Sequence, residues 1–350
     1  MIVFLTKIRI LLIPKINAAV IGLGVGESHI LGLQSHPFCE VKTICDINQE
    51  VVQKVGSRYP SCSLSTDPNL ILSDPNIQLV CIASYDDVHE QQVVSALRNN
   101  KHVFVEKPLC LTSKELSNIA EELKLHPHLL LSSNLILRKT PRFIELHERI
   151  KLGQLGNIFH IEGSYDYGRL HKLTDGWRGK IPNYSVTLGG GIHLIDLMIW
   201  LSGKKITYVS GVGNGLATSE SHFEGLSLTS ASIGFEDGST AQITSNYASV
   251  TPHHHKLCIY GTKGTFEQTH MGAAYYCSRD PSEKPEEVST PYPGTAKGDL
   301  LANFIDSILD EENLPLISAQ EVLDATSVAL AIDQSIRSQS SQSVNYFYLN

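Results

Sequence analysis

The first part of the chain alternates between short apolar runs and longer stretches in which apolar residues recur every three or four positions. Short apolar runs are typical of buried β-strands, and the longer periodic stretches are typical of amphipathic helices. Strands are predicted at 18–21, 41–45, 79–83, 102–105 and 129–132, and helices at 28–35, 49–58, 88–99 and 113–125. Strands that alternate with helices build a doubly wound parallel sheet, which we expect over residues 15–134.

The pattern changes after Pro141. A helix is predicted to about Lys151, and beyond it short β-like runs are separated by the turn sequences EDGS at 236–239 and GTKG at 261–264. This succession predicts a second α/β domain, over residues 135–340, with an open and largely antiparallel sheet. Two further helices are predicted at 299–310 and 319–337. The polar run SQSSQS after them is expected to fray.

A glycine-rich turn, with Gly22, Gly24 and Gly26, directly follows the first predicted strand and leads into a helix. Glycines there let the backbone approach a pyrophosphate, whose charge is met by the N–H groups at the helix start. Asp46, 24 residues after Gly22, stands where a carboxylate accepts hydrogen bonds from the adenosine ribose. No arginine directly follows Asp46, and its charge would repel a 2′-phosphate. The sequence therefore predicts a Rossmann domain that binds NAD rather than NADP. A tight turn in another α/β fold, and a helix N-cap for Asp46, are the alternative interpretations.

Several motifs extend along the rest of the chain: ASYDDVH at 83–89, Glu106-Lys107-Pro108, Trp177-Arg178 and GGGIHLIDLMIW at 189–200. Together they resemble the Gfo/Idh/MocA family, which includes glucose-fructose oxidoreductase and inositol dehydrogenase, from residue 18 to about residue 337. The resemblance implies a Rossmann domain joined to an α/β domain, with a sugar or cyclitol between its open sheet and the nicotinamide. The expected activity is NAD(H)-dependent hydride transfer to or from a hydroxyl-bearing carbon of a sugar, sugar derivative or cyclitol.

The resemblance also implies two catalytic residues. Lys107 would hydrogen-bond the substrate hydroxyl, and a histidine that matches His193 would help to move its proton. The family's aspartate four residues before that histidine is replaced here by Gly189. With Gly189 unable to act, His193 is the natural base near neutral pH and Lys107 the second candidate. A surface ion pair with Glu106 is the alternative for Lys107, and a buried structural role is the alternative for His193.

Other residues are predicted to line the two pockets. Asp196 would lie on the same helical face as His193, and would either orient it or contact substrate. The predicted cofactor-binding residues are Gly22, Gly24, Gly26, Asp46, Ser84, His89 and Glu106. The predicted substrate-binding residues are Lys107, Trp177, Arg178, Tyr184, His193 and Asp196. Packing at the domain junction is the alternative for the Trp-Arg pair, and a helix start is the alternative for His89.

Composition narrows the partners. A net charge of -8 offers no basic field for nucleic acid, so we expect a small-molecule substrate. Seven scattered cysteines without a CxxC pair argue against a disulfide framework and a zinc site, and favour the cytoplasm. We expect no metal at 253–255, because adjacent strand residues point to opposite faces. The apolar residues 1–14 are interrupted by Lys7 and Arg9, which argues against a membrane span and a signal peptide and favours a loose extension.

Two other functions compete with the dehydrogenase. The loss of an expected catalytic group at Gly189 is compatible with a catalytically silent dinucleotide-binding regulator. An NAD-dependent glycosidase is the other alternative, in which the cofactor carries hydride only transiently. In each case an apolar face on the second sheet would be costly to expose, so we expect a homodimer or homotetramer.

Overall fold

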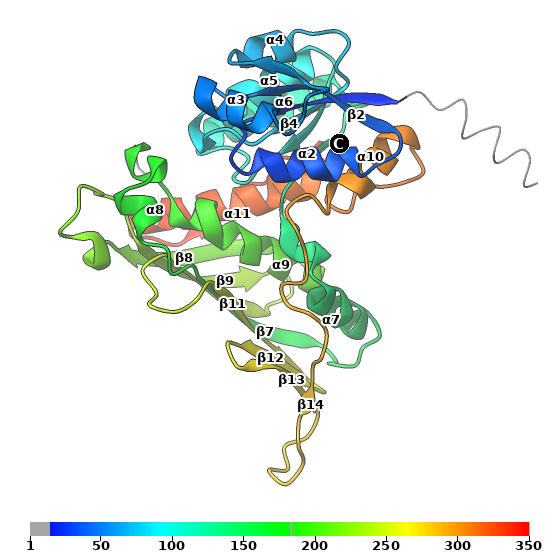
Figure 1. The fold of residues 1–350 in the computed structure, drawn as a ribbon. Helices are drawn as coiled ribbons and strands as arrows, with labels where there is room; N and C mark the ends of the chain where they lie inside the picture. Colours follow the sequence, from blue (N-terminus) through cyan, green and yellow to red (C-terminus); the bar gives the residue numbers. More distant parts are fainter. Residues whose placement is uncertain (1–14, 183, 350) are drawn as a thin grey trace, which may run out of the picture.

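The computed structural model describes residues 15–182 and 184–349. Two sheets lie one above the other, with the long helix α11 (Ala319–Ser338) between them (Figure 1). The predicted extension at 1–14 lies outside the described residues. None of the helices within the described ranges is long and apolar enough to cross a membrane.

The first sheet has six parallel strands in the order β3-β2-β1-β4-β5-β6, the doubly wound arrangement predicted from the sequence. The strands are β1 Ile16–Ile21, β2 Cys39–Cys45, β3 Ser63–Ser65, β4 Leu79–Ile82, β5 His102–Val105 and β6 Leu131–Ser133. The helices are α2 Gly26–Gln34, α3 Gln49–Gly56, α4 Pro68–Leu72, α5 His89–Arg98 and α6 Ser113–Leu125. The sequence pattern missed β3 and α4, which are too short for a periodic signal.

Local capping explains where two of these helices begin. The Thr112 hydroxyl accepts a hydrogen bond from the Glu115 N–H, and the Glu115 carboxylate accepts one from the Thr112 N–H, which together form a capping box at the start of α6. Asn48, rather than Asp46, caps α3, because its side chain accepts hydrogen bonds from the next helical N–H groups. The carboxylate of Asp46 is therefore not needed as that helix cap.

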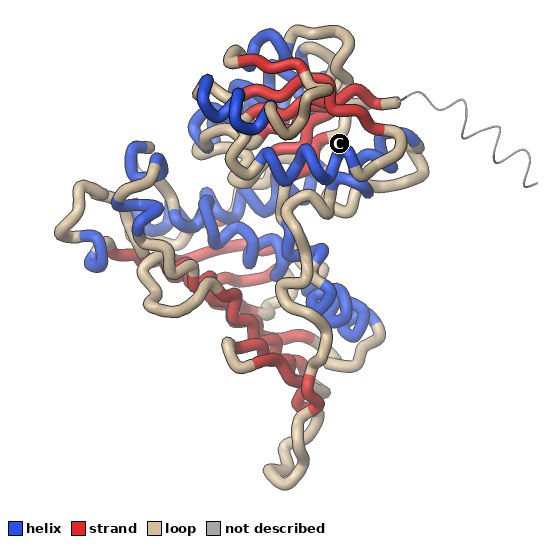
Figure 2. Tube along the Cα trace, in the orientation of Figure 1, coloured by secondary structure: helices blue, strands red, loops and turns tan. Residues whose placement is uncertain are grey.

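The second sheet has nine strands in the order β14-β13-β12-β11-β7-β10-β9-β8-β15. It is mixed and mostly antiparallel, because β10 runs parallel to β7 while the other neighbours are antiparallel. Figure 2 shows its strands in red in the lower half of the molecule. The strands are β7 Ile158–Asp166, β8 Ile206–Asn214, β9 Leu228–Phe235, β10 Thr240–Asn246, β11 His254–Gly261, β12 Thr265–Thr269, β13 Gly272–Tyr276, β14 Glu286–Glu287 and β15 Gln342–Ser343. The helices are α7 Pro141–Lys151, α8 His171–Thr174, α9 Ile192–Ser202, α10 Leu301–Leu309 and α11. The two predicted turn sequences join β9 to β10 and β11 to β12.

The C-terminal segments tie the two halves together. Helix α10 lies against α2, where the Nε2 atom of His36 is 3.1 Å from the Asp306 carboxylate. Helix α11 contacts β8 of the second sheet and β6 of the first. The polar tail does not fray as predicted, because β15 pairs with β8 and the Tyr346 hydroxyl donates a 2.7 Å hydrogen bond to the Ile206 carbonyl. Backbone pairing with an open sheet edge outweighs the polar composition of this run.

Candidate active site

Two of the three glycines in the turn after β1 are required by close packing, and the third faces open space. Gly22 has a φ of +87°, and a Cβ there would lie 2.3 Å from the Ala83 carbonyl oxygen. A Cβ at Gly26 would lie 2.9 Å from a Val20 methyl group, so this glycine lets α2 pack closely on the sheet. A Cβ at Gly24 would meet no protein atom within 4 Å. The turn is therefore fixed by tight packing at two positions and open at the third, as a pyrophosphate site requires.

Asp46 is attached to this turn. One of its carboxylate oxygens accepts a 2.8 Å hydrogen bond from the Leu23 N–H, and the other accepts a 3.0 Å bond from the Asn48 N–H. Helix α2 begins after Val25 with no side chain capping its first N–H groups. These N–H groups and the remaining lone pairs of Asp46 suit the pyrophosphate and the ribose of a dinucleotide.

His89 joins the loops that follow β4 and β5. Its Nδ1 atom is 2.7 Å from the Pro108 carbonyl oxygen, and its Nε2 atom is 3.3 Å from that of Ser84. The side chain is fully buried at the first residue of α5, which agrees with the alternative of a helix start. The Ser84 hydroxyl donates to Gln92, so it also supports this loop. His89 thereby fixes the loop that carries Lys107.

Glu106 and Lys107 follow β5 and make separate contacts. The Glu106 carboxylate accepts hydrogen bonds from His29 at 3.1 Å and Asn134 at 2.7 Å. Burial opposes its ionisation, but the hydrogen bond and charge of His29 prevail and lower the pKa of Glu106 to about 2. The Nζ atom of Lys107 instead donates a 2.5 Å hydrogen bond to the Gly189 carbonyl of the second domain. Lys107 is therefore not the surface ion-pair partner considered as the alternative.

His193 lies on α9, one turn beyond Gly189, and is 8% exposed. Its Nδ1 atom has no hydrogen-bond partner among the described residues. Burial and the charge of Lys107 lower the pKa of His193 well below its usual value. Its ring is stacked 6.1 Å from that of Tyr165 and lies 6.3 Å from that of His255. The geometry thus gives a neutral imidazole within the electrostatic reach of Lys107.

The space beside Gly189 is filled by side chains from other segments. A Cβ at Gly189 would lie 2.0 Å from the Tyr184 hydroxyl and 2.9 Å from that of Tyr247. The Tyr184 hydroxyl accepts a 3.0 Å hydrogen bond from Arg178, whose guanidinium lies 4.3 Å above the Trp177 ring. Tyr184 is buried, and burial raises its phenol pKa. A phenol therefore takes the volume that a side chain at 189 would need.

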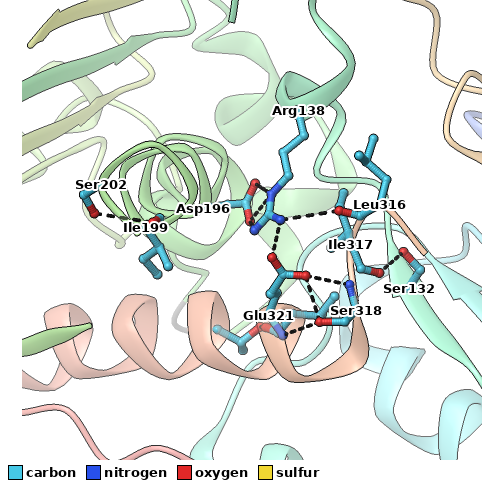
Figure 3. Close-up of polar contacts among 11 residues, drawn as sticks. Ser132, Arg138, Asp196, Ile199, Ser202, Leu316, Ile317, Ser318 and Glu321 are labelled. Carbon is cyan, nitrogen blue, oxygen red and sulfur yellow. Dashed lines mark hydrogen bonds and ion pairs between the residues drawn. The ribbon is translucent and has the colours of Figure 1, made fainter. Parts of the chain in front are cut away.

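Asp196 forms a buried ion pair with Arg138. It is buried at 1% exposure, and both carboxylate oxygens accept hydrogen bonds from Arg138, at 2.6 to 3.1 Å. Arg138 also contacts Glu321 at the start of α11 (Figure 3). Its two partners come from different helices, so the guanidinium joins α9 to α11. Both carboxylate oxygens of Asp196 are therefore engaged at this junction, and its role toward His193 or substrate stays a prediction.

Comparison with known proteins fits this geometry. The model of an oxidoreductase family with an NAD-binding Rossmann fold matches residues 16–133, and that of the GFO/IDH/MocA C-terminal domain matches residues 143–267. The chain belongs to the Gfo/Idh/MocA family. The resemblance inferred from the motifs is thereby confirmed, together with the Rossmann fold of the first domain.

Individual members of the Gfo/Idh/MocA family align at low identity. An uncharacterized oxidoreductase of Schizosaccharomyces pombe is 32% identical over 198 residues, and the alignment covers 54% of this chain and about half, 53%, of that protein. The scyllo-inositol 2-dehydrogenase (NAD(+)) of Bacillus subtilis is 26% identical over 260 residues, covering 72% and 73% of the two chains. A crystal structure of scyllo-inositol dehydrogenase from Lactobacillus casei, with bound NAD(H) and scyllo-inositol, has a TM-score of 0.80 at 21% identity and covers 94% and 99%. That structure shares the fold.

Near His193, an aromatic wall that the motifs above do not include is formed by Tyr165, Tyr167, Tyr247, His253 and His255. Tyr167 and Tyr247 have ring centres 4.7 Å apart, and the His253 ring lies 5.2 Å from Tyr167. His253 and His255 share one side of β11 with rings 4.9 Å apart, whereas His254 packs on His270. The alternating Tyr-x-Tyr and His-x-His spacings could have predicted this aromatic wall. In the described part of the chain, no group of three or more His, Cys, Asp or Glu side chains is arranged to hold a metal ion.

Proposed function

We propose that this protein is an NAD(H)-dependent dehydrogenase or reductase of a sugar, sugar derivative or cyclitol. The proposal rests on one observation above all: Lys107, at the carboxyl end of a Rossmann strand, donates to the backbone beside His193. Ligands bind at the carboxyl ends of the strands in such sheets. The relatives named for inositol and the structure with bound scyllo-inositol support the substrate class.

The residues at the carboxyl end of the first sheet fit NAD. Gly24 leaves open space, the first N–H groups of α2 lack a side-chain cap, and Asp46 has lone pairs for ribose hydroxyls. Bound NAD would supply the nicotinamide that exchanges hydride with the substrate carbon. Ser84, His89 and Glu106 would support the cofactor site indirectly, because their polar atoms bond to neighbouring protein groups and hold the loops of the site in place.

Two side chains would act on the substrate hydroxyl. Lys107 would donate a hydrogen bond to the reacting oxygen and stabilise the alkoxide character that develops on it. Burial and the charge of Arg178 lower the pKa of Lys107, so its proton is easier to move than that of an ordinary lysine. The neutral ring of His193 would accept a hydrogen bond from the same hydroxyl and hold it in position. Arg178, Trp177 and Tyr184 would line the side of the substrate pocket opposite Lys107 and His193.

The substrate class can be tested with a panel of polyols. The purified chain is mixed with NAD and with scyllo-inositol, myo-inositol, levoglucosan or glucose, and NADH is followed by its absorbance. Turnover of at least one polyol is expected. Tight NAD binding without turnover of any of them would favour the silent regulator. Cleavage of a glycoside without net NADH would favour the NAD-dependent glycosidase.

Cofactor choice is expected to depend on Asp46. Asp46→Ala should weaken NAD binding more than about tenfold and narrow the preference over NADP, because one charge-assisted hydrogen bond contributes about 1.5–3 kcal/mol. Titration of both dinucleotides measures the effect. Asp46→Asn is the matched control, since it keeps an oxygen for the Leu23 N–H but removes the charge. Tighter binding of NADP than NAD by the wild-type chain would contradict the ribose assignment.

We further propose that the protein is a homodimer or homotetramer whose subunits contact each other through the second sheet. Phe159, Tyr208 and Val212 on β7 and β8 are 52%, 50% and 71% exposed, which is costly for side chains of this kind in water. Light scattering at micromolar concentration should therefore give a mass at least twice the 38.5 kDa of one chain. A single 38.5 kDa species would contradict the proposed assembly.

A further inference from the structure

Asp86 is a buried carboxylate that the reaction scheme above does not use. It begins the short 3-10 turn Asp86–Val88 after β4 and is 5% exposed. Its Oδ2 atom has no hydrogen-bond partner in residues 15–182 and 184–349, and it is the one carboxylate oxygen among the buried unpartnered polar atoms there. A buried carboxylate without a partner is costly, and such groups concentrate at functional sites.

The fold brings the loops of Asp86 and Lys107 to the same edge of the first sheet, where the charge of Lys107 acts on the Asp86 carboxylate. Strands β4 and β5 are neighbours, with Ile82 opposite Val105, so the loops that carry the two residues leave the same edge of the sheet. The contact between the His89 ring and the Pro108 carbonyl joins the two loops, a few residues after Asp86 in one loop and one residue after Lys107 in the other. Asp86 therefore shares its loop cluster with the lysine that is proposed to contact the substrate.

The second domain closes this cluster from the other side. The Tyr85 ring lies 4.8 Å from that of Trp177. Arg178, the next residue after Trp177, donates a hydrogen bond to the Tyr184 hydroxyl. The charged and titratable groups that act on the Asp86 carboxylate are His89, Lys107, Arg178, Glu106 and Tyr184. Glu106 is already paired with His29 and Asn134. Asp86 is thus an anion with an unpartnered oxygen within the electrostatic range of two cations, Lys107 and Arg178.

Burial has opposite effects on the pKa values of Asp86 and His193, the two candidate acceptors of the substrate proton. Burial lowers the pKa of His193, and the charge of Lys107 lowers it further, so the ring resists protonation. Burial raises the pKa of Asp86 against the opposing charges of His89, Lys107 and Arg178. Since the pKa of Lys107 is lowered, a proton passes more easily from this lysine to Asp86 than between an ordinary pair of these groups.

We propose that Asp86 is the proton acceptor of the oxidation, acting through Lys107; this inference rests on the proposed function. In this step the ammonium group of Lys107 gives one proton to Asp86 and takes one from the substrate hydroxyl. The substrate O–H and C–H bonds break, the carbonyl C=O bond forms, and hydride passes to the NAD of the proposed function. The proton ends on Asp86 as a carboxylic acid, and the reduction follows the same path in reverse. Asp86 is accordingly a positioning residue that acts through Lys107.

The test compares Asp86→Asn with Asp87→Asn. Asp87 is the exposed neighbour in the same turn, so the two variants remove the same charge one residue apart. With NAD and scyllo-inositol, or the panel polyol that turns over fastest, Asp86→Asn should lower kcat by about 10²–10⁴. Its residual rate should rise with pH, because hydroxide must then take the proton, while Asp87→Asn keeps the wild-type profile. Wild-type kcat in Asp86→Asn would overturn the role of Asp86 and leave polyol oxidation intact. No turnover by the wild-type chain would instead overturn the proposed function and this inference with it.

A second measurement does not depend on turnover. A carboxyl group whose pKa is raised by folding destabilises the fold as the pH rises from its unfolded value through its folded one. The NAD-free Asp86→Asn variant should therefore unfold at a higher temperature than the wild-type chain at pH 7, and the gap should close near pH 3. Asp87→Asn should show no such pH-dependent gap. A lower unfolding temperature for Asp86→Asn at pH 7 would identify Asp86 as a stabilising ion-pair partner and overturn the proposal.

Discussion

Lys107→Ala is expected to lower turnover by about 10²–10³ or more while NAD affinity changes less than about threefold. The lysine donates to the Gly189 carbonyl and no hydrogen bond joins its side chain to the glycine turn in the described residues, so under the proposed function its loss removes a substrate contact and spares the pyrophosphate site. Steady-state rates with the panel polyol and a titration with NAD measure the two effects separately.

Two further variants isolate the amine of this lysine. Lys107→Met keeps most of the aliphatic stem, so a similar loss of rate would assign the effect to the amino group rather than to a cavity. Lys114→Ala removes an exposed lysine on α6 and should leave turnover unchanged. Near wild-type turnover in Lys107→Ala would make the proposed mechanism wrong, and the silent regulator would become the better interpretation.

The largest loss of stability is expected for Arg138→Ala. This side chain is 2% exposed and joins Asp196 on α9 to Glu321 on α11 (Figure 3). Its removal leaves the carboxylate of Asp196 buried without a partner, which typically costs about 3–5 kcal/mol in the free energy of unfolding. Urea unfolding at pH 7, with the wild-type chain alongside, measures this difference.

A surface ion pair provides the control. Arg58 pairs with Glu27, and the two side chains are 44% and 32% exposed. Because water screens such a pair, Arg58→Ala should cost only about 1 kcal/mol or less. Equal losses in the two variants would show that the buried pair does not stabilise the junction between α9 and α11.

Local patterns predicted most of the fold correctly. In the first domain, buried strands and amphipathic helices each repeat over enough residues to be recognised, and glycines at strand ends have a steric meaning that does not need the rest of the chain. The prediction was wrong for the tail after residue 338, because its polar composition says nothing about an open strand edge far away in the sequence. In the fold, β15 pairs with the open edge of β8. Its order is decided by tertiary pairing.

The sequence by itself determined the Rossmann domain, the family, and the positions of Lys107 and His193, because each depends on neighbours within one motif. Only the tertiary structure decided which acidic residues are buried and which are paired. Asp196 lies three residues from His193, yet it pairs with Arg138, 58 positions away in the chain. Asp86 and Asp87 are adjacent and chemically alike, yet the packing of one turn between two domains buries only the first. Burial and pairing depend on contacts between distant segments, which no local pattern encodes.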